Sequence, residues 1–246
     1  MAAGKGTRMK SARPKVLHTL AGRSLLQHVL NAVAGLGADR TLVIVGHGAE
    51  AVRTQVAEHG ALGVLQEPQL GTGHAVQQAV PHLPDAGTTL ILNGDVPMIE
   101  ADTAAALVAA CGGTKLALLT VELSDPTGYG RIVRDPGQGD AVKAIVEHKD
   151  ASAAQRAIRE VYTGMLAAPT AWLKRSVMSL KNDNAQREYY LTDIVAIAEG
   201  ERLPVLAVPA HDETEVAGVN SAAELAGLER RLQRRQTVVV VARRDW

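Results

Sequence analysis

The chain of 246 residues carries 26 Lys and Arg residues and 26 Asp and Glu residues, and 46% of its residues are hydrophobic, which is typical of a globular protein with one large or two small domains. Its net charge of zero and its aromatic content of 2% argue against a nucleic-acid partner and against a polybasic contact with a membrane surface. The single cysteine and the eight scattered histidines exclude an internal disulfide framework and give no zinc-ligand spacing.

The first half of the chain alternates short apolar runs with helical patterns. The apolar runs are continuous and rich in branched residues, as in strands buried on both faces, and they cover 41–46, 88–92 and 115–121. Apolar residues at helical spacing occupy 23–36, 50–59, 72–80 and 103–110. This alternation predicts an α/β fold with a Rossmann-like, doubly wound and mostly parallel sheet.

The second half of the chain has a different pattern. The segments 128–134 and 142–147 predict two shorter strands around a Pro-Gly turn, and 161–166 predicts a third. We expect these strands to form a smaller lobe with a mixed sheet. The segment 221–236 predicts a C-terminal helix, because Leu225, Leu228 and Leu232 recur at helical spacing, whereas the tail 237–246 is left unassigned.

The sequence shows no membrane or secretion signal. No apolar run approaches the ~18 residues of a membrane-spanning helix. The segment 1–6 also lacks the apolar stretch of a signal peptide. We therefore expect a cytoplasmic protein without a membrane partner.

A glycine-rich segment near the N-terminus is the first candidate for phosphate binding. Gly4 and Gly6 permit left-handed backbone and close approach to an anion, and Arg8 and Lys15 could neutralise phosphate oxygens. The segment matches neither the P-loop pattern nor the complete dinucleotide-binding pattern, which needs a third glycine. A plain glycine-rich turn with surface cations therefore remains the alternative.

Three further segments place polar groups at the ends of predicted elements. Gly71 and Thr72 precede a helical pattern, where backbone N–H groups favour an anion or an acceptor, although a simple helix start explains them too. Asp95 follows a buried run, and ligands of open α/β sheets bind beyond the carboxyl ends of strands. One carboxylate with few other protein ligands is typical of Mg²⁺, but Asp95 could equally cap a turn. Glu147 could accept hydrogen bonds from sugar hydroxyls or belong to a solvated charge cluster.

Taken together, these segments occur in the order found in one enzyme family. They are Ala2–Met9 with Pro14 and Lys15, Gln66 with Gln69–Ala75, Gly94–Pro97, Asp125–Arg131, Ile145–Asp150, Asn184–Gln186, Glu188–Asp193 and Gly218–Asn220. This series resembles the nucleoside-diphosphate-sugar pyrophosphorylases, and in particular the uridyltransferase half of their bifunctional bacterial members. The resemblance covers residues 1 to about 235.

The resemblance implies a nucleotidyltransferase fold with a sugar-binding lobe and a role for individual residues. Those that would hold the nucleotide are Ala2, Ala3, Gly4, Gln66, Gly71 and Thr72. Arg8 and Lys15 would act in catalysis by contacting the triphosphate, and Asp95 and Asn220 would bind Mg²⁺. Those that would bind the sugar are Gly130, Glu147, Tyr162, Tyr190 and Thr192.

The implied reaction converts UTP and N-acetylglucosamine 1-phosphate into UDP-N-acetylglucosamine and pyrophosphate. The sugar phosphate is already an anion and attacks the α-phosphorus in line, so catalysis consists of positioning and charge neutralisation without a protein nucleophile. The product would serve the synthesis of peptidoglycan and lipopolysaccharide precursors.

The sequence departs from the family pattern at several positions. Met1 stands where the family has the last Leu of an inner strand, so we expect that strand to be missing and its neighbours to expose backbone groups and apolar surface. Tyr162 stands where the family usually has an Asn that helps to hold the sugar, and Asn93 stands where it usually has a Tyr. Arg187 replaces a usual Gly.

The expected domain organisation follows from the same resemblance. Residues 1–220 would form the nucleotidyltransferase domain, and 221–246 would form a connecting helix and the unassigned tail. The family's left-handed β-helix, which binds acetyl-CoA and forms the trimer, has no matching hexapeptide repeats here, so we expect neither acetyl transfer nor the trimer. Two alternatives stay open, namely an inactive nucleotide-binding fragment and a related nucleotidyltransferase for another base or sugar.

Overall fold

The computed structural model describes residues 1–4, 6–138 and 141–242. Its main sheet is mixed and has the order β10-β6-β9-β7-β8, with β5 paired to β9 as well. The strands of this sheet are β5 (Thr88–Ile91), β6 (Leu116–Glu122), β7 (Gly130–Asp135), β8 (Ala141–Val146), β9 (Glu160–Pro169) and β10 (Val205–Pro209). Strands β10 and β6 run parallel, whereas β9 runs antiparallel to β5, β6 and β7.

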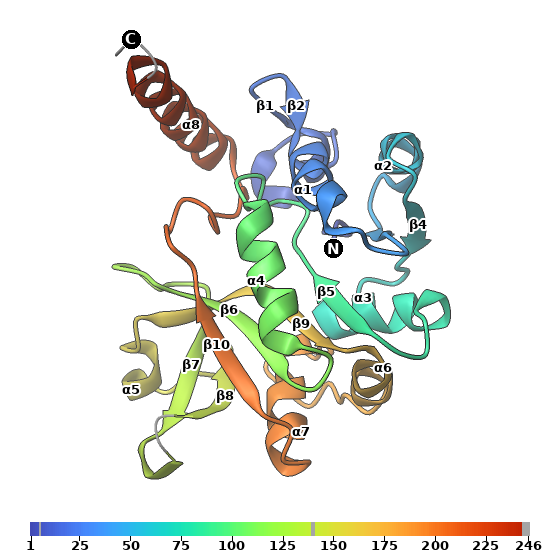
Figure 1. Cartoon of the computed structure of the whole chain (residues 1–246), viewed down its shortest axis with the longest axis vertical. Coiled ribbons are helices and arrows are strands. Elements are labelled where there is room, and N and C mark those ends of the chain that lie inside the picture. The colour runs from blue at the N-terminus through green and yellow to red at the C-terminus, as the bar shows by residue number, and fades with distance from the viewer. Residues whose placement is uncertain (5, 139–140, 243–246) are drawn as a thin grey trace.

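Two smaller pairs of strands lie in the N-terminal part of the chain (Figure 1). Strands β3 (Leu42–Val45) and β4 (Leu62–Leu65) form a parallel pair. Strands β1 (Thr19–Leu20) and β2 (Arg23–Ser24) form a short antiparallel hairpin.

Helices cover both faces of the main sheet (Figure 1). The helices are α1 (Leu25–Val33), α2 (Ala49–Glu58), α3 (Thr72–Ala79), α4 (Ala101–Cys111), α5 (Ala153–Arg156), α6 (Thr170–Met178), α7 (Ile194–Gly200) and α8 (Ala222–Ala242). Helix α4 packs on one face, and α6 and α7 pack on the other. None of the helices in the described part of the chain combines the length and the hydropathy that are needed to cross a bilayer.

Alternation along the central strands divides the apolar side chains between two cores. In β9, Val161 and Met165 belong to the core under α4, whereas Tyr162 and Leu166 belong to the core under α6 and α7. A strand with apolar side chains on both faces reads as a continuous apolar run. This explains why the sequence pattern locates β6 and β9.

Residues 1 and 2 connect the β3–β4 pair to the main sheet. The N–H of Ala2 donates to the carbonyl of Ile44 at 2.9 Å, and Ala2 forms a parallel bridge with Val45. On the other side, the carbonyl of Met1 accepts from the N–H of Gly94 at 2.9 Å, and the Met1 amino group donates to the carbonyl of Leu92 at 2.5 Å. Burial lowers the pKa of this amino group to about 6.

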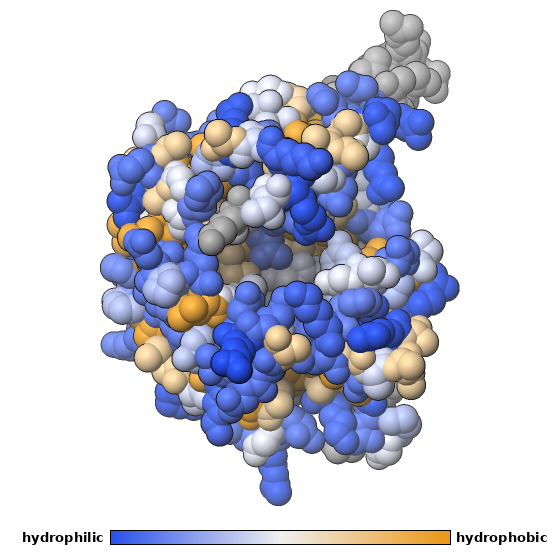
Figure 2. Space-filling view, turned by 180° about the vertical axis from the view of Figure 1, so that it is seen from behind, coloured by the Kyte–Doolittle hydropathy of each residue, from blue (hydrophilic) through white to orange (hydrophobic). Residues whose placement is uncertain are grey.

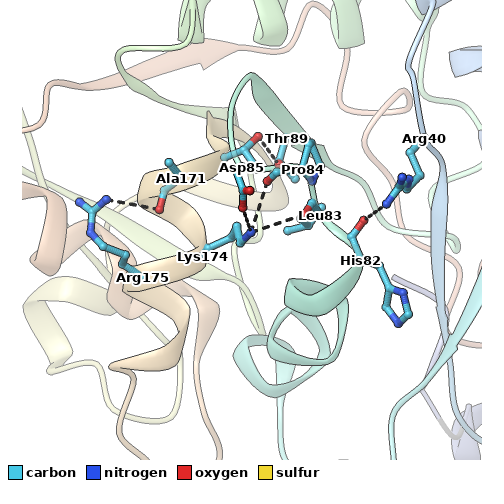
Figure 3. Close-up of polar contacts among 10 residues, drawn as sticks. Arg40, His82, Leu83, Pro84, Asp85, Thr89, Ala171, Lys174 and Arg175 are labelled. Atoms are coloured by element: carbon cyan, nitrogen blue, oxygen red, sulfur yellow. Dashed lines mark hydrogen bonds and ion pairs between the residues drawn. The ribbon is translucent and has the colours of Figure 1, made fainter.

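The segment that leads into β5 is held by two basic side chains from other parts of the chain (Figure 3). Lys174 of α6 donates to Asp85 at 2.7 Å and lies 3.5 Å from the carbonyl of Leu83. Arg40, which precedes β3, donates to the carbonyl of His82 at 2.6 Å. These contacts hold the chain just before β5, and the candidate metal ligand Asp95 lies four residues after the other end of this strand.

The α/β class is confirmed, and the sheet differs from the expected one in two ways. It is mixed rather than mostly parallel, because β9 returns through its centre in the opposite direction to three neighbours. The strands β7 and β8, which were expected in a separate lobe, continue this same sheet. The C-terminal helix is present, and the side chains of 235–246 lie outside the described residues.

Candidate active site

The glycine-rich segment passes close to Lys15. Ala2 and Ala3 are buried, and Gly6 adopts left-handed backbone with φ of 59°. A Cβ atom at Gly6 would lie 2.8 Å from the Cβ of Lys15, so only glycine allows the two segments to approach. The following turn, Thr7–Met9, buries Met9 and leaves Arg8 exposed. Lys5 lies outside the described residues.

Lys15, Asp95 and Asn220 converge although they are far apart in the sequence. The Lys15 Nζ atom lies 2.5 Å from Asp95 Oδ2 and 3.0 Å from Asn220 Oδ1. The backbone N–H of Val219 donates to the Asp95 carbonyl at 2.9 Å, which holds the segment before α8 against the end of β5. The structure therefore brings together both predicted metal ligands and one of the two predicted catalytic cations.

The start of α8 fixes the backbone at Asn220. Glu224 Oε2 accepts from the N–H of Asn220 at 2.6 Å and from the N–H of Ser221 at 3.2 Å. In return, Ser221 Oγ accepts from the N–H of Glu224 at 3.2 Å. This reciprocal arrangement is a capping box, which satisfies free N–H groups at a helix start.

The oxygen pair of Asp95 and Asn220 fits a divalent cation that keeps other ligands. A positive ammonium group already lies within hydrogen-bond distance of both oxygens, so the site favours a cation. Within the described ranges, no group of three or more His, Cys, Asp or Glu side chains is placed to hold a metal ion. One carboxylate and one amide oxygen match Mg²⁺, which is bound through few protein ligands together with water and substrate phosphates.

Three of the predicted nucleotide-binding residues, Gln66, Gly71 and Thr72, also lie together. Gln66 follows β4, is 4% exposed, and its Nε2 donates to the carbonyl of Gly71 at 2.9 Å. Gly71 has a φ of 106°, and a Cβ atom there would lie 2.7 Å from the carbonyl oxygen of Tyr189. Thr72 Oγ1 accepts from the N–H of Leu191 at 3.0 Å. These contacts fasten the segment to the part of the chain that contains Tyr190 and Thr192.

Glu147 lies at the end of β8 beside two other predicted sugar-binding residues. Thr192 Oγ1 donates to Glu147 Oε1 at 3.0 Å. Burial raises the pKa of the Glu147 carboxyl, although the hydrogen bond from Thr192 opposes the shift. A Cβ atom at Gly130 would lie 2.8 Å from Ile145 Cγ2 and 3.7 Å from Glu147 Oε1, so glycine keeps the space in front of the carboxylate open.

Tyr190 belongs to a polar network that the sequence interpretation did not contain. Its hydroxyl accepts from Gln186 Nε2 at 2.9 Å and donates to Asp150 Oδ2 at 3.3 Å. Lys149 Nζ in turn donates to Gln186 Oε1 at 2.5 Å. Asp150 and Gln186 belong to two of the motifs that occur in the family's order. Their place in these motifs is the sequence signal that could have identified them as site residues.

Two of the positions that depart from the family pattern are on or beside β9, because Tyr162 belongs to this strand and Asn93 contacts the residue that follows Tyr162. Tyr162 is 6% exposed, and its hydroxyl is buried without a hydrogen-bond partner. Burial and the nearby Glu147 charge raise the pKa of this hydroxyl. Asn93 follows β5, and its Nδ2 donates to the carbonyl of Thr163 at 3.3 Å.

Arg187, the third position that departs from the family pattern, has left-handed backbone with a φ of 53°. This conformation favours glycine, the residue that the family usually has there.

A hydrogen bond links two of the groups of residues. Thr72 of the predicted nucleotide-binding group accepts from the N–H of Leu191, which lies between Tyr190 and Thr192 of the predicted sugar-binding group. The cation group contains Asp95, which lies four residues after the end of β5. Figure 2 shows a deep hollow in one face, between the part of the molecule with α1 and α2 and the part with β7 and β8. Such an arrangement could hold a nucleotide and a second phosphorylated group side by side.

Comparisons with known proteins identify the family of this chain. Residues 1–160 match the family model described as "MobA-like NTP transferase domain". A protein of Methylibium petroleiphilum named "Bifunctional protein GlmU" is 68% identical over 241 residues, which are 96% of this chain and 52% of that protein. A protein of the same name from Polaromonas naphthalenivorans is 57% identical and covers 96% of this chain and 51% of its own length. These relatives confirm the resemblance indicated by the sequence motifs.

A solved structure supports the fold. A UDP-glucose pyrophosphorylase complexed with UDP-glucose superimposes with a TM-score of 0.73 at 14% identity, and the match covers 95% of this chain and 97% of that one. At this identity the likeness shows the nucleotidyltransferase-like fold. The chain spans about half of the length of the curated relatives it matches.

Proposed function

This chain belongs to the MobA-like NTP transferase domain family, and we propose that it is the uridyltransferase that makes UDP-N-acetylglucosamine and pyrophosphate from UTP and N-acetylglucosamine 1-phosphate. The observation that carries the proposal is the cation site of Lys15, Asp95 and Asn220 next to the glycine-rich segment. The relatives named GlmU support this choice of base and sugar.

In the proposed reaction, an oxygen of the sugar phosphate attacks the α-phosphorus of UTP. A new P–O bond forms to this oxygen, and the bond to the β-phosphate breaks so that pyrophosphate leaves. Because the attacking oxygen is already anionic, the protein has to position the two substrates and neutralise their charges. Arg8 and Lys15 are assigned to the phosphate oxygens, where a positioned cation stabilises the charge of the transition state.

Asp95 and Asn220 would hold Mg²⁺ through one oxygen each. When bound, the ion neutralises phosphate charge and aligns the two substrates. The capping contact of Glu224 with the Asn220 N–H and the contact of Val219 with the Asp95 carbonyl hold the backbone at these two residues before the ion binds. This rigidity lowers the cost of assembling the site.

The base and the sugar would be recognised on either side of the phosphates. Ala2, Ala3 and Gly4 hold the nucleotide through backbone groups, and Gln66, Gly71 and Thr72 are assigned to uracil. Glu147 accepts from the sugar hydroxyls, and its position is fixed by Thr192. Gly130 and Tyr190 would line the remaining surface of the sugar pocket, whereas the predicted sugar-binding residue Tyr162 is buried in the core.

We assign the nucleotidyltransferase domain to residues 1–220 and the connecting helix to the segment that follows. The family model ends at residue 160, but Asn220 supplies half of the proposed Mg²⁺ site, so the functional unit extends to it. We place the reaction in the cytoplasm, where nucleoside triphosphates are available.

Pyrophosphate release tests the proposal directly. The chain should release pyrophosphate when UTP, N-acetylglucosamine 1-phosphate and Mg²⁺ are all present, and Asp95→Ala should abolish release. Folded protein that releases none would favour the inactive nucleotide-binding alternative. The residue types at Asn93 and Tyr162 favour testing other substrates too, and faster release with CTP, GTP or glucose 1-phosphate would assign a related nucleotidyltransferase activity.

A further inference from the structure

We propose that Glu215 is a positioning residue of the cation site. Its buried carboxylate holds the segment that ends at Asn220 against the segment that begins at Asp95, and it thereby sets the separation of the two oxygens assigned to the metal ion. The inference rests on the proposed function. It gives a role to a buried carboxylate that the reaction itself does not use.

Glu215 is buried to a degree that is unusual for a carboxylate. It is 1% exposed, and it is the one acidic side chain among the buried residues of the described part of the chain. Removal of a carboxylate from water is costly unless it is hydrogen-bonded or paired. Glu215 Oε1 accepts from the backbone N–H of Glu100 at 3.1 Å, at the start of α4. The positive end of the helix dipole also stabilises the negative charge there.

Two hydrogen bonds connect the segment after β5 to the segment before α8, which passes the start of α4 (Figure 1). One joins the N–H of Val219 to the carbonyl of Asp95 at 2.9 Å. The other joins Glu215 to Glu100. In each bond a residue early in one segment meets a residue late in the other, so the two segments run in opposite directions. Each segment is thus held against the other at two separate points.

Apolar side chains lie between the two hydrogen-bonded points in both segments. Val96 and Ile99 of the first segment and Val216 of the second are at most 4% exposed, and all three belong to the core under α4. A densely packed core transmits displacements instead of absorbing them. The two segments therefore form one packed unit, and the cation site lies at one end of it.

Glu215 acts on the cation site through this packed unit. Loss of its carboxylate removes one of the two hydrogen bonds between the segments, at the end opposite to Asp95 and Asn220. Asn220 then moves more freely against Asp95, so a divalent cation that takes an oxygen from each residue binds less tightly. The role of Glu224 is different, because its capping contact fixes Asn220 relative to α8 and not relative to Asp95.

Binding of Mn²⁺ in the presence of UTP tests the inference, measured by electron paramagnetic resonance. Glu215→Ala should weaken Mn²⁺ binding about tenfold, which is the loss of about one hydrogen bond. Its affinity for UTP in the absence of metal should be unchanged, whereas a general loss of structure would weaken UTP binding as well. Glu215→Gln keeps an oxygen that accepts from the Glu100 N–H, so it should bind Mn²⁺ almost as the unaltered chain does.

Val142→Ala is the matched control for loss of stability. Val142 lies in β8, is 5% exposed, and belongs to the core on the opposite face of the sheet from α4. Its truncation should lower the melting temperature and leave Mn²⁺ binding unchanged. Unchanged Mn²⁺ binding in Glu215→Ala, or equal weakening by Val142→Ala, would overturn the proposal.

Hydrogen exchange separates this inference from the proposed function. The N–H of Val219 should exchange about tenfold faster in Glu215→Ala than in the unaltered chain, because one of the two connections between the segments is lost. If the unaltered chain binds no Mn²⁺ with UTP and releases no pyrophosphate, the proposed function fails. The exchange rate still decides whether Glu215 holds the segments together, and an unchanged rate would overturn the inference.

Discussion

Lys15 donates a hydrogen bond to Asp95 at 2.5 Å across 80 residues of sequence, and the same ammonium group lies 3.0 Å from Asn220. An internal cation thus neutralises the Asp95 carboxylate and donates to the neutral Asn220 amide oxygen, the two oxygens assigned to Mg²⁺. A metal ion bound at the proposed site would compete with the ammonium for the same oxygens, so Lys15 would have to turn towards another anion. In the proposed reaction the phosphates of the nucleotide would provide that anion, and metal binding would be coupled to nucleotide binding.

Removal of the Lys15 ammonium should therefore have opposite effects on metal binding and on catalysis. Lys15→Met should tighten Mn²⁺ binding in the absence of nucleotide, measured by electron paramagnetic resonance with Mn²⁺ as the probe. The same variant should lose about 10²–10³-fold in rate, because a positioned cation is missing from the transition state. Lys115→Met, at an exposed position before β6, is the control. Unchanged Mn²⁺ affinity in Lys15→Met would contradict the competition.

Glu147 should make the stability of the protein depend on pH. Burial raises the pKa of this carboxyl in the folded chain above its ordinary value, so the folded state binds the proton more tightly than the unfolded state. Stability should therefore fall as the pH rises from the ordinary carboxyl pKa past the raised value, and then level off. Glu147→Gln should remove this part of the pH dependence, measured as melting temperature from mildly acidic to neutral pH.

The exposed Glu58 provides the control for this experiment. Glu58→Gln should leave the pH profile of the melting temperature as it is in the unaltered chain. An identical profile in Glu147→Gln would show that the Glu147 carboxyl does not titrate differently in the two states.

Replacement of Arg187 by glycine should stabilise the folded protein. Its left-handed backbone, with φ of 53°, is strained for a residue that has a Cβ atom. Arg187→Gly should raise the free energy of unfolding by about 0.5–1 kcal/mol, since relief of the strain exceeds the entropic cost of glycine. Arg187→Ala removes the charge but keeps the strain, so it should give no such gain. Urea unfolding of the two variants separates the backbone effect from the charge effect.

The capping box of α8 should control metal binding from outside the site. Glu224→Ala removes the acceptor of the Asn220 and Ser221 N–H groups and should cost about 1 kcal/mol of stability, as loss of a helix cap does. Because Asn220 is then less firmly placed, nucleotide-dependent Mn²⁺ binding should weaken. Glu229→Ala, further along the same helix, is the matched control. Equal Mn²⁺ binding in both variants would show that the cap acts on stability alone.

The strands that could be predicted from the sequence are those with strong apolar runs. Strands β3, β5 and β6 are buried enough to read as continuous runs, and their positions agree with the expected ones within a few residues. Strand β4 could not be found, because Gly63 interrupts it and Leu62 and Leu65 are exposed. Strand β10 ends in Pro209 and lies at the edge of the sheet, where little apolar patterning is required.

The direction of β9 could not be predicted from its residues. A strand that is covered on both faces has the same apolar run whether its neighbours are parallel or antiparallel.

The contacts within the site could not be predicted from local sequence patterns either. Motifs located Asp95, Gln66 and Glu147, but the contact of Lys15 with Asn220 joins residues 205 apart, and no local pattern encodes such a distance.

The backbone of residues 1 and 2 is hydrogen-bonded to β3 on one side and to the end of β5 on the other. The segment proposed to hold the nucleotide therefore also connects the two sheets. Any displacement of one sheet against the other must deform the segment beside the triphosphate. A bound nucleotide that fixes Ala2 and Ala3 would stiffen this connection. Nucleotide binding would therefore make the two sheets more rigid relative to each other.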